Sequence, residues 1–338
     1  MSAPRAEGEA LPKGSASRSS PALVVSNVTK KFGNHVAVEN ISFEVPRGVV
    51  YGILGPNGAG KSTTLRMVND ILAPDSGEIV ILDGLKPGAE AAPRIGYLPE
   101  ERGLYPKMRV LDMIQFMAEL RGLARAESRA RAGKWLERLG LAQWAKNKVE
   151  DLSKGMQQKV QFATALIHEP DLVILDEPWS GLDPINAEVL QEVVEEIRAA
   201  GRTVMFSTHG MEQAEKVCDN VCIIARGKKV LDGRLKDLKR AAAAEGLIAL
   251  AFGDDASRDK AKLVLADKAL VTGERPPRHG DSAETEIELA HGVASQQLLA
   301  ALVAAGVELR RFEVVTPTLH QIFVSKVGDA TVAERRAT

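Results

Sequence analysis

The sequence lacks a long hydrophobic run, and this absence excludes a protein that crosses a bilayer with helices of its own. No apolar stretch in the 338 residues approaches the ~18–20 residues that a membrane-spanning helix needs. The first residues also lack the apolar centre of a secretory signal peptide, so we expect a cytoplasmic protein. If it works at a membrane, a different chain must supply the part that spans it.

Cysteine is scarce as well, since the chain contains only Cys218 and Cys222. Two cysteines do not make a disulfide framework, and this pair lacks the Cys-x-x-Cys spacing of a metal site. The residues between them, Asp219 and Asn220, indicate a helix end that separates the two thiols. We therefore expect two small buried thiols.

Net charge is nearly absent, because 44 Lys and Arg residues face 45 Asp and Glu residues and leave a formal charge of −1. This balance gives no general attraction to nucleic acid or acidic lipid, so we expect no nucleic-acid partner. The 45% hydrophobic and 26% charged residues are those of an ordinary soluble protein. The length predicts about two domains.

One stretch stands out, because it matches the phosphate-binding pattern G-x-x-x-x-G-K-[ST]. It consists of Gly55, Pro56, Asn57, Gly58, Ala59, Gly60, Lys61, Ser62 and Thr63. An apolar run at 49–54 predicts a buried strand before it, and 64–69 predicts a helix after it. A glycine-rich turn that happens to end in Lys-Ser is the alternative, but strand and helix together favour the phosphate-binding loop (P-loop).

The residue types explain the expected chemistry. Gly58 and Gly60 allow the backbone to wrap closely around phosphates, with N–H groups pointing inward. The N-terminus of the following helix adds partial positive charge. Lys61 would reach the β- and γ-phosphates of a nucleotide, and the Ser62 hydroxyl would hold Mg²⁺.

Two acids and a histidine follow other predicted strands. The apolar run 171–176 ends in Asp176 and Glu177, at the carboxyl edge where ligands bind in open parallel sheets. Such a strand could end in Asp-Glu by chance, but Mg²⁺ beside a P-loop needs an acid, which favours function. His209 follows a strand at 203–207. A lone His there is usually a polar loop residue, but its place at the same edge favours contact with the phosphates.

Three further features remain open on residues alone. Ser153 begins a helix as its N-cap, which is also what any capped helix start looks like. Phe32 lies between two strand signals and is either a core aromatic, which we favour on its own, or a platform for a base. Apolar residues at helix spacing between 109 and 145 predict a helical insert. They are Leu111, Ile114, Met117 and Leu120, then Leu136 and Leu139.

These patterns predict an α/β fold with two ordered domains. We expect a P-loop domain at 22–244, with an antiparallel β subdomain and the helical insert at about 105–165. The order β-α-β-β-α-β predicts a small α+β, ferredoxin-like domain at 245–328. The polar segments 1–21 and 329–338 are expected to be tails, the first of them disordered.

The order of these motifs along the chain resembles that of the nucleotide-binding subunit of ATP-binding-cassette (ABC) transporters. The motifs are, in order, the P-loop, the helical insert, Leu-Ser-x-Gly, the strand ending in Asp-Glu, Gly-Leu-Asp and the late histidine. The resemblance covers about 23–238. It implies that residues 55–63 are the Walker A loop and that Phe32 stacks on adenine. It further implies that Asp176 holds Mg²⁺, that Glu177 is the general base for the attacking water, and that His209 contacts the γ-phosphate. Asp183 would belong to the loop that crosses a homodimer.

The chain departs from the family pattern at two places. Glu100 stands where the family commonly has Gln, and a carboxylate can still coordinate Mg²⁺ but cannot donate a hydrogen bond. The signature Leu-Ser-Gly-Gly-Gln is altered in its last residues. Ser153 and Gly155 remain for the γ-phosphate, Lys154 adds a charge, and Met156 lacks the amide of Gln.

Residues 96–105 and 316–323 are similar to a subgroup of drug- or sodium-exporting ATPases with a small C-terminal domain. The resemblance implies an ATP hydrolase that uses ATP and Mg²⁺ as a homodimer. It would export a drug, ion or lipid-like substrate through a separate integral-membrane permease. Through this permease, the protein would be bound peripherally to the inner face of the cell membrane. A soluble regulatory or nucleic-acid-handling ATPase is the alternative, disfavoured by a single cassette without long coiled coils. A binding module with inactive catalysis is disfavoured by the intact Lys61, Asp176 and Glu177.

Overall fold

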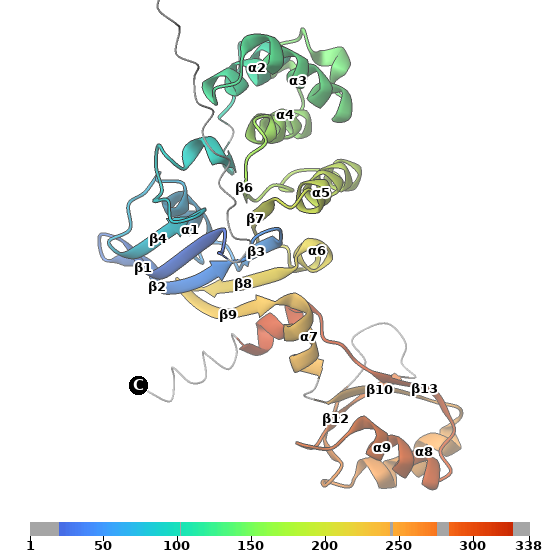
Figure 1. Ribbon diagram of the computed structural model, residues 1–338. Helices are drawn as coiled ribbons and strands as arrows, with labels where there is room; N and C mark the ends of the chain where they lie inside the picture. The colour runs from blue at the N-terminus through green and yellow to red at the C-terminus, as the bar shows by residue number, and fades with distance from the viewer. Residues whose placement is uncertain (1–19, 102, 244–245, 276–283, 327–338) are drawn as a thin grey trace, which may run out of the picture. The chain divides into compact units, whose positions relative to one another are not determined.

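The computed structural model describes residues 20–101, 103–243, 246–275 and 284–326 (Figure 1). Except for residues 20 and 21, the expected tails lie outside these ranges, and so does the predicted domain boundary near residue 244. The chain forms two compact units. The first comprises residues up to 49, 63–175 and 179–205, and the second comprises 50–62, 176–178 and the chain from 206 onwards.

The first unit contains the predicted antiparallel subdomain, a sheet of order β2-β1-β4. Its strands are β1 (Leu23–Phe32), β2 (His35–Val45) and β4 (Ser76–Ile81). The alternating residues predicted two half-buried strands, and a tight turn at Gly33, with φ of 58°, joins β1 to β2. Alternate residues such as Leu23 and Val25 are buried, as the pattern requires.

A second sheet carries the functional loops and has the strand order β5-β6-β7-β3-β8-β9. Parallel pairing joins β5 to β6 and β3 to β8, whereas β9 runs antiparallel to β8. Every residue of β3 and β6 is buried, as expected of parallel strands covered on both faces. The strands are β3 (Val50–Leu54), β5 (Ile95–Leu98), β6 (Leu172–Asp176), β7 (Thr203–Thr208), β8 (Asn220–Ala225) and β9 (Lys228–Arg234).

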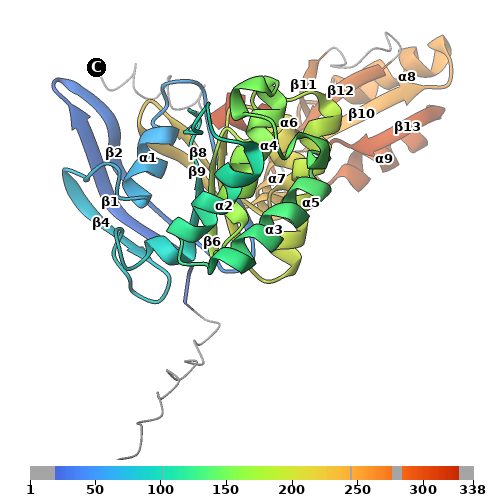
Figure 2. The same ribbon diagram turned by 90° about the horizontal axis from the view of Figure 1, so that it is seen from above.

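The helical insert of the first unit is confirmed as α2 (Val110–Leu120), α3 (Arg125–Arg138) and α4 (Lys154–Leu166) (Figure 2). Of the apolar residues whose spacing predicted this helix, Ile114 is buried and Leu120 is exposed. The helix buries Val110, Met113, Ile114 and Ala118, and Leu120 is 64% exposed. Apolar residues surround most of this helix, so two stripes share the helical spacing, and the stripe facing α3 and α4 is the buried one.

Helix α5 (Pro184–Ala199) begins at a recognisable cap. It starts directly after Asp183, four residues before the amphipathic pattern of 188–199 begins. The Asp183 carboxylate accepts a hydrogen bond from Asn186 N at 3.0 Å, which lowers its pKa, and Pro184 occupies the first turn. The others are α1 (Lys61–Val68), α6 (Met211–Val217), α7 (Leu235–Ala243) and the 3₁₀ turns Ala92–Arg94, Ala142–Trp144 and Val149–Asp151.

The ferredoxin-like pattern is confirmed in the second unit. Its four strands are antiparallel in the order β11-β12-β10-β13, and two helices connect them. The elements are β10 (Leu247–Phe252), α8 (Asp255–Leu265), β11 (Val271–Arg275), β12 (Glu284–Leu289), α9 (Ser295–Ala304) and β13 (Leu309–Val314). The expected loop at 273–284 begins later, because β11 continues to Arg275, and residues 276–283 lie outside the described chain.

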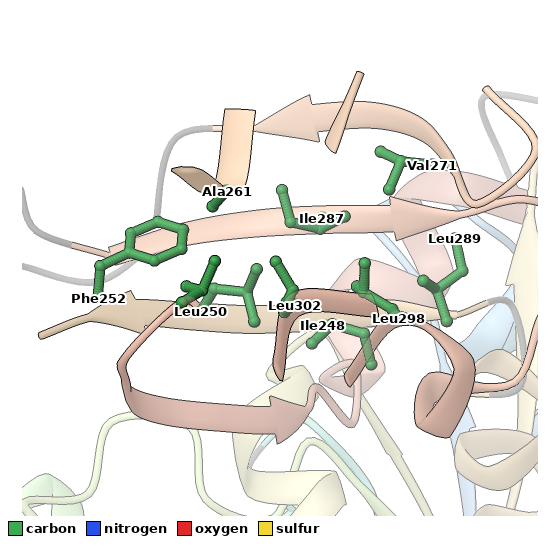
Figure 3. Packing of buried hydrophobic residues seen from close by; sticks show 10 residues of the cluster. Ile248, Leu250, Phe252, Ala261, Val271, Ile287, Leu289, Leu298 and Leu302 are labelled. Atoms are coloured by element: carbon green, nitrogen blue, oxygen red, sulfur yellow. The ribbon is translucent and has the colours of Figure 1, made fainter. Parts of the chain in front are cut away.

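Alternate residues of β10 form the core of this small domain (Figure 3). Ile248, Leu250 and Phe252 point to the same face as Ile287 of β12, where Leu298 and Leu302 of α9 pack. A final helix follows at 319–326. Among the residues described, none of the helices combines the length and apolar character needed to cross a membrane.

The two cysteines are free thiols, Cys222 buried and Cys218 half-buried. Helix α6 ends at Val217, so Cys218 is its C-cap and Cys222 lies in β8. Burial raises the pKa of both thiols well above the ordinary range. The predicted separation of the two thiols is confirmed, and so is the burial of Cys222, whereas Cys218 is only half-buried.

His168 makes folding of the first unit dependent on pH. Its Nε2–H donates to Ile95 O at 3.1 Å, and burial lowers its pKa from 6.5 to about 4. The folded state therefore favours the neutral ring, so stability is fully present above pH 6.5 and falls as the pH drops through 4. In urea unfolding between pH 7 and pH 4, His168→Gln should flatten this decline. An equally steep decline in the variant would contradict the assignment.

Candidate functional site

The P-loop joins β3 to α1 and contains glycines at positions where another residue would either clash or adopt a strained backbone conformation. A Cβ on Gly55 would come 2.0 Å from the carbonyl oxygen of Ile224 in β8. Gly58 and Gly60 have φ values of 75° and 103°, in the left-handed region. The loop backbone is therefore held against the sheet in the shape that exposes successive N–H groups.

Lys61, the first residue of α1, lies inside this loop and is only 6% exposed. Its ammonium donates to the carbonyl oxygens of Gly55 at 2.9 Å and Pro56 at 3.3 Å. The same nitrogen lies 3.4 Å from Glu177 Oε1. A buried cation within the loop, paired with a carboxylate, provides positive charge for phosphate oxygens.

The Ser62 hydroxyl donates to Asp176 Oδ1 at 3.0 Å, which brings the start of α1 to the end of β6. Asp176 is fully buried. A serine hydroxyl beside a carboxylate is the donor set that P-loop proteins use for Mg²⁺, so these residues fit that ion. The described residues contain no group of three or more His, Cys, Asp or Glu residues able to hold a metal. Mg²⁺ accordingly suits a site whose remaining ligands are phosphates and water.

Glu177 is held next to His209. The ring Nδ1 lies 3.1 Å from both carboxylate oxygens, and the His209 side chain is 59% exposed while that of Glu177 is 10% exposed. Glu177 has φ of 48°, a strained conformation for a residue with a side chain. This conformation points to a position fixed for chemistry rather than for packing alone.

Ser207 supports both acids, and sequence reasoning missed it. Its hydroxyl donates to Asp176 Oδ1 and accepts from Glu177 N at 3.1 Å, and its carbonyl oxygen accepts from the same N–H at 3.2 Å. The side chain is fully buried. The available signal was a hydroxyl residue near the end of an otherwise apolar strand, two positions before His209.

Lys61, Ser62, Asp176, Glu177 and His209 are thus brought together within the second unit. Gly55–Gly60 lie in the same unit, whereas the other predicted site residues, among them Phe32, Glu100 and Asp183, belong to the first unit. Phe32 is 48% exposed, with Lys30 Nζ 5.7 Å from its ring centroid. The interpretation of Phe32 as a core aromatic was therefore wrong, and an exposed ring remains open to stacking.

The altered signature lies at the start of α4. Ser153 is the N-cap, and its Oγ accepts from Met156 N at 3.3 Å, which confirms the predicted cap. Ser153 and Lys154 are exposed, whereas Gly155 is half-buried. A Cβ on Gly155 would lie 3.5 Å from Leu182 Cδ2, so the signature turn is adjacent to the loop that carries Asp183.

Glu100 is exposed, in the loop after β5. Gln161 of α4 fixes this loop from both sides. Its Nε2 donates to Pro99 O at 2.9 Å and to Glu101 O at 3.2 Å. The carboxylate is therefore presented from a loop tied to the helical insert.

Comparison with known proteins agrees with this arrangement. The profile of the family described as "ABC transporter" matches residues 38–180, and that described as "ATP-binding protein DrrA1-3-like, C-terminal domain" matches 233–327. The chain is similar to the uncharacterized ABC transporter ATP-binding protein YhaQ of Bacillus subtilis (strain 168), with 40% identity over 90% of this chain and 98% of that one.

Two further comparisons extend the likeness. The linearmycin resistance ATP-binding protein LnrL of the same organism is 33% identical over 90% of this chain and 98% of its own length. A solved dimeric post-hydrolysis state of the ATP-binding cassette MJ0796 with ADP and Pi is 26% identical, with a TM-score of 0.58. That match covers 63% of this chain and 98% of the other.

Removing the Ser207 hydroxyl should destabilise the fold. Ser207→Ala leaves the buried Asp176 carboxylate without one of its donors, so we expect a loss of about 1–3 kcal/mol in unfolding free energy. Ser128→Ala is the matched control, because this equally buried hydroxyl donates only to the carbonyl oxygens of Leu123 and Ala124. Urea unfolding measures both. Equal losses in the two variants would show that Ser207 has no special role.

Proposed function

The chain belongs to the ABC transporter family of ATP-binding proteins, and from this premise we propose that it powers export through a separate membrane permease. The hydrolytic part of the proposal rests on one observation, the grouping of five side chains at one edge of the sheet. They are Lys61, Ser62, Asp176, Glu177 and His209. Similarity over nearly the whole length to a linearmycin resistance protein supports export. We assign hydrolysis to residues 22–244 and a separate role to 245–328.

In the proposed binding mode, the amides of Gly55–Thr63 surround the β- and γ-phosphates. Phosphate oxygens replace the carbonyl oxygens of Gly55 and Pro56 as partners of Lys61. The exposed Phe32 ring stacks on the adenine. Ser62 and Asp176 would hold Mg²⁺, with Glu100 as a further ligand, and the ion would supply positive charge against the phosphates.

Hydrolysis then depends on Glu177. Its carboxylate accepts a proton from water while the water oxygen attacks the γ-phosphorus, and the bond to the bridging oxygen of ADP breaks. His209, 3.1 Å from that carboxylate, positions the γ-phosphate and keeps Glu177 oriented. The positive φ of Glu177 and its two bonds to Ser207 fix the base before ATP arrives.

A second copy of the chain completes each site. Ser153, Lys154, Gly155 and Met156 lie at a helix N-terminus, which attracts the γ-phosphate of an ATP bound to the partner. The loop with Asp183 is adjacent to Gly155, so both elements meet the partner together. Two copies would therefore hold two ATP molecules between them.

The helical insert offers a surface for the permease. Tyr105, Pro106, Lys107, Met108 and Phe116 line a depression of about 530 Å³. Tyr105 is 54% exposed, and its ring meets Phe116 edge to face at 6.0 Å. Exposed aromatic groups of this kind mark protein contacts, and an apolar segment of the permease fits them. This contact would place the protein on the inner face of the cell membrane.

Glu177→Gln is expected to abolish turnover, since an amide cannot take the proton from water. Loss of general-base catalysis should lower kcat about 10²–10⁴-fold while ATP still binds and dimers accumulate. Phosphate release and size-exclusion chromatography with ATP measure the two effects, with exposed Glu137→Gln as the control. Hydrolysis at the normal rate by Glu177→Gln would exclude this role.

Tyr105→Asp should reduce the fraction of the protein that sediments with membranes of its own cells. A charge in the apolar depression opposes burial against the permease. Leu263→Asp is the control, because Leu263 is 83% exposed and lies in α8 of the C-terminal domain. If both variants kept the full membrane-bound fraction, the depression would not be the permease contact.

A further inference from the structure

The end of the described chain returns to the helix that follows His209. Glu215 of α6 accepts a hydrogen bond from the backbone N–H of Leu319, with Oε2 2.9 Å from the nitrogen. Its other oxygen forms an ion pair with Lys239 of α7. One carboxylate therefore connects three segments, α6, α7 and the helix at 319–326 (red in Figure 1).

The helix at 319–326 begins at this contact, and capping hydrogen bonds stabilise its first turn. Thr318 N donates to Gln321 Oε1 at 2.8 Å, and Gln321 N donates to Thr318 Oγ1 at 3.3 Å, a reciprocal capping pair. Leu319 is fully buried and Ile322 is 4% exposed, so the helix is packed along one side. Glu215 adds a negative charge at its N-terminus, where the helix dipole favours an anion.

A cavity separates the same helix from His209. About 990 Å³ in volume, it is lined on one side by His209, Met211 and Glu212 and on the other by His320, Gln321 and Val324. The hydrogen bond between Glu215 and Leu319 N–H offers a connection between His209 and the C-terminal helix through α6. Helix α6 starts directly after His209, with Gly210 as its N-cap, and Glu215 lies in its second turn.

Helix α6 needs such support, because it has only seven residues and a helix this short gains little stability from its own hydrogen bonds. Gly210 N donates to Thr208 Oγ1 at 3.0 Å, and Ala214 N donates to Gly210 O at 3.1 Å. These hydrogen bonds connect the backbone on both sides of His209 to the first turn of the helix. A shift of α6 would therefore move the His209 ring relative to Glu177.

We propose that Glu215 is a positioning residue for hydrolysis, through which the C-terminal helix holds His209 in place. The proposal rests on the proposed function, since it assigns the C-terminal segment a part in the reaction. The bond to Leu319 N–H carries the effect. The ion pair with Lys239 contributes little, because both side chains are partly exposed, at 26% and 21%.

The test uses the full-length protein with Glu215→Ala and Glu215→Gln. Glu215→Ala removes the acceptor of Leu319 N–H, and we expect kcat for ATP to fall about fivefold, the size of the net effect of one ordinary hydrogen bond. KM for ATP should stay within about twofold, because the P-loop is untouched. Glu215→Gln keeps an oxygen for Leu319 N–H and should restore most of kcat.

Glu212→Ala is the matched control, since Glu212 is an exposed carboxylate on the same helix. A Glu215→Ala variant with the kcat of wild type, or with the same loss as Glu212→Ala, would overturn the proposal. The proposal would also be overturned if Glu215→Ala lowered kcat and thermal stability together and Glu215→Gln restored neither. That result would show that Glu215 only supports the structure.

Hydrogen exchange separates this proposal from the proposed function. Amides of Met211–Val217 and 319–326 should exchange faster in Glu215→Ala than in wild type or Glu212→Ala, whether or not ATP is hydrolysed. Unchanged exchange in both segments would overturn the connection. Absence of hydrolysis by the wild-type protein would instead refute the proposed function, and the exchange result would still decide the connection.

Discussion

The site depends on one carboxylate oxygen, Asp176 Oδ1, which accepts hydrogen bonds from the hydroxyls of Ser62 and Ser207. These bonds join the start of α1 and the end of β7 to the end of β6. Burying a carboxylate costs free energy unless donors surround it, so the three segments must keep their relative positions for the fold to be stable. The same requirement places the Ser62 hydroxyl where a cation held by phosphates would need it.

Lys61 and Glu177 meet a related constraint with opposite charges. Both are nearly buried, and the ammonium nitrogen lies 3.4 Å from the carboxylate. The cation is also satisfied by two carbonyl oxygens of its own loop, whereas the carboxylate also meets the His209 ring. Each partner therefore has a second polar contact. A phosphate group can form an ion pair with Lys61 while Glu177 keeps its contact with His209 and is not left as an isolated buried charge.

The sequence predicted the parts of the fold that local rules determine. The P-loop, the strands ending at Asp176 and Ser207, and the β-α-β-β-α-β order follow from apolar runs and turn residues. The buried face of α2 could not be predicted, because its apolar residues surround the helix and only packing against α3 and α4 decides which stripe is inside. Periodicity in the sequence therefore identifies a helix more reliably than it identifies which face of that helix is buried.

Long-range polar contacts set the second limit. Ser207 bonds to residues about thirty positions earlier, and Glu215 meets Leu319 at a separation of 104. No local pattern marks either partner, since a serine at a strand end and a glutamate on a short helix are common. Phe32 shows the converse, because its residue type favoured the core and the structure leaves it half exposed.

These contacts converge on the end of β7. Ser207 supports Asp176 and Glu177, Thr208 accepts the N–H of Gly210, and His209 contacts Glu177 directly. Helix α6 begins immediately afterwards, and its Glu215 holds the C-terminal helix. A displacement of α6 would therefore act on the strand end at which the two acids and the histidine share their support.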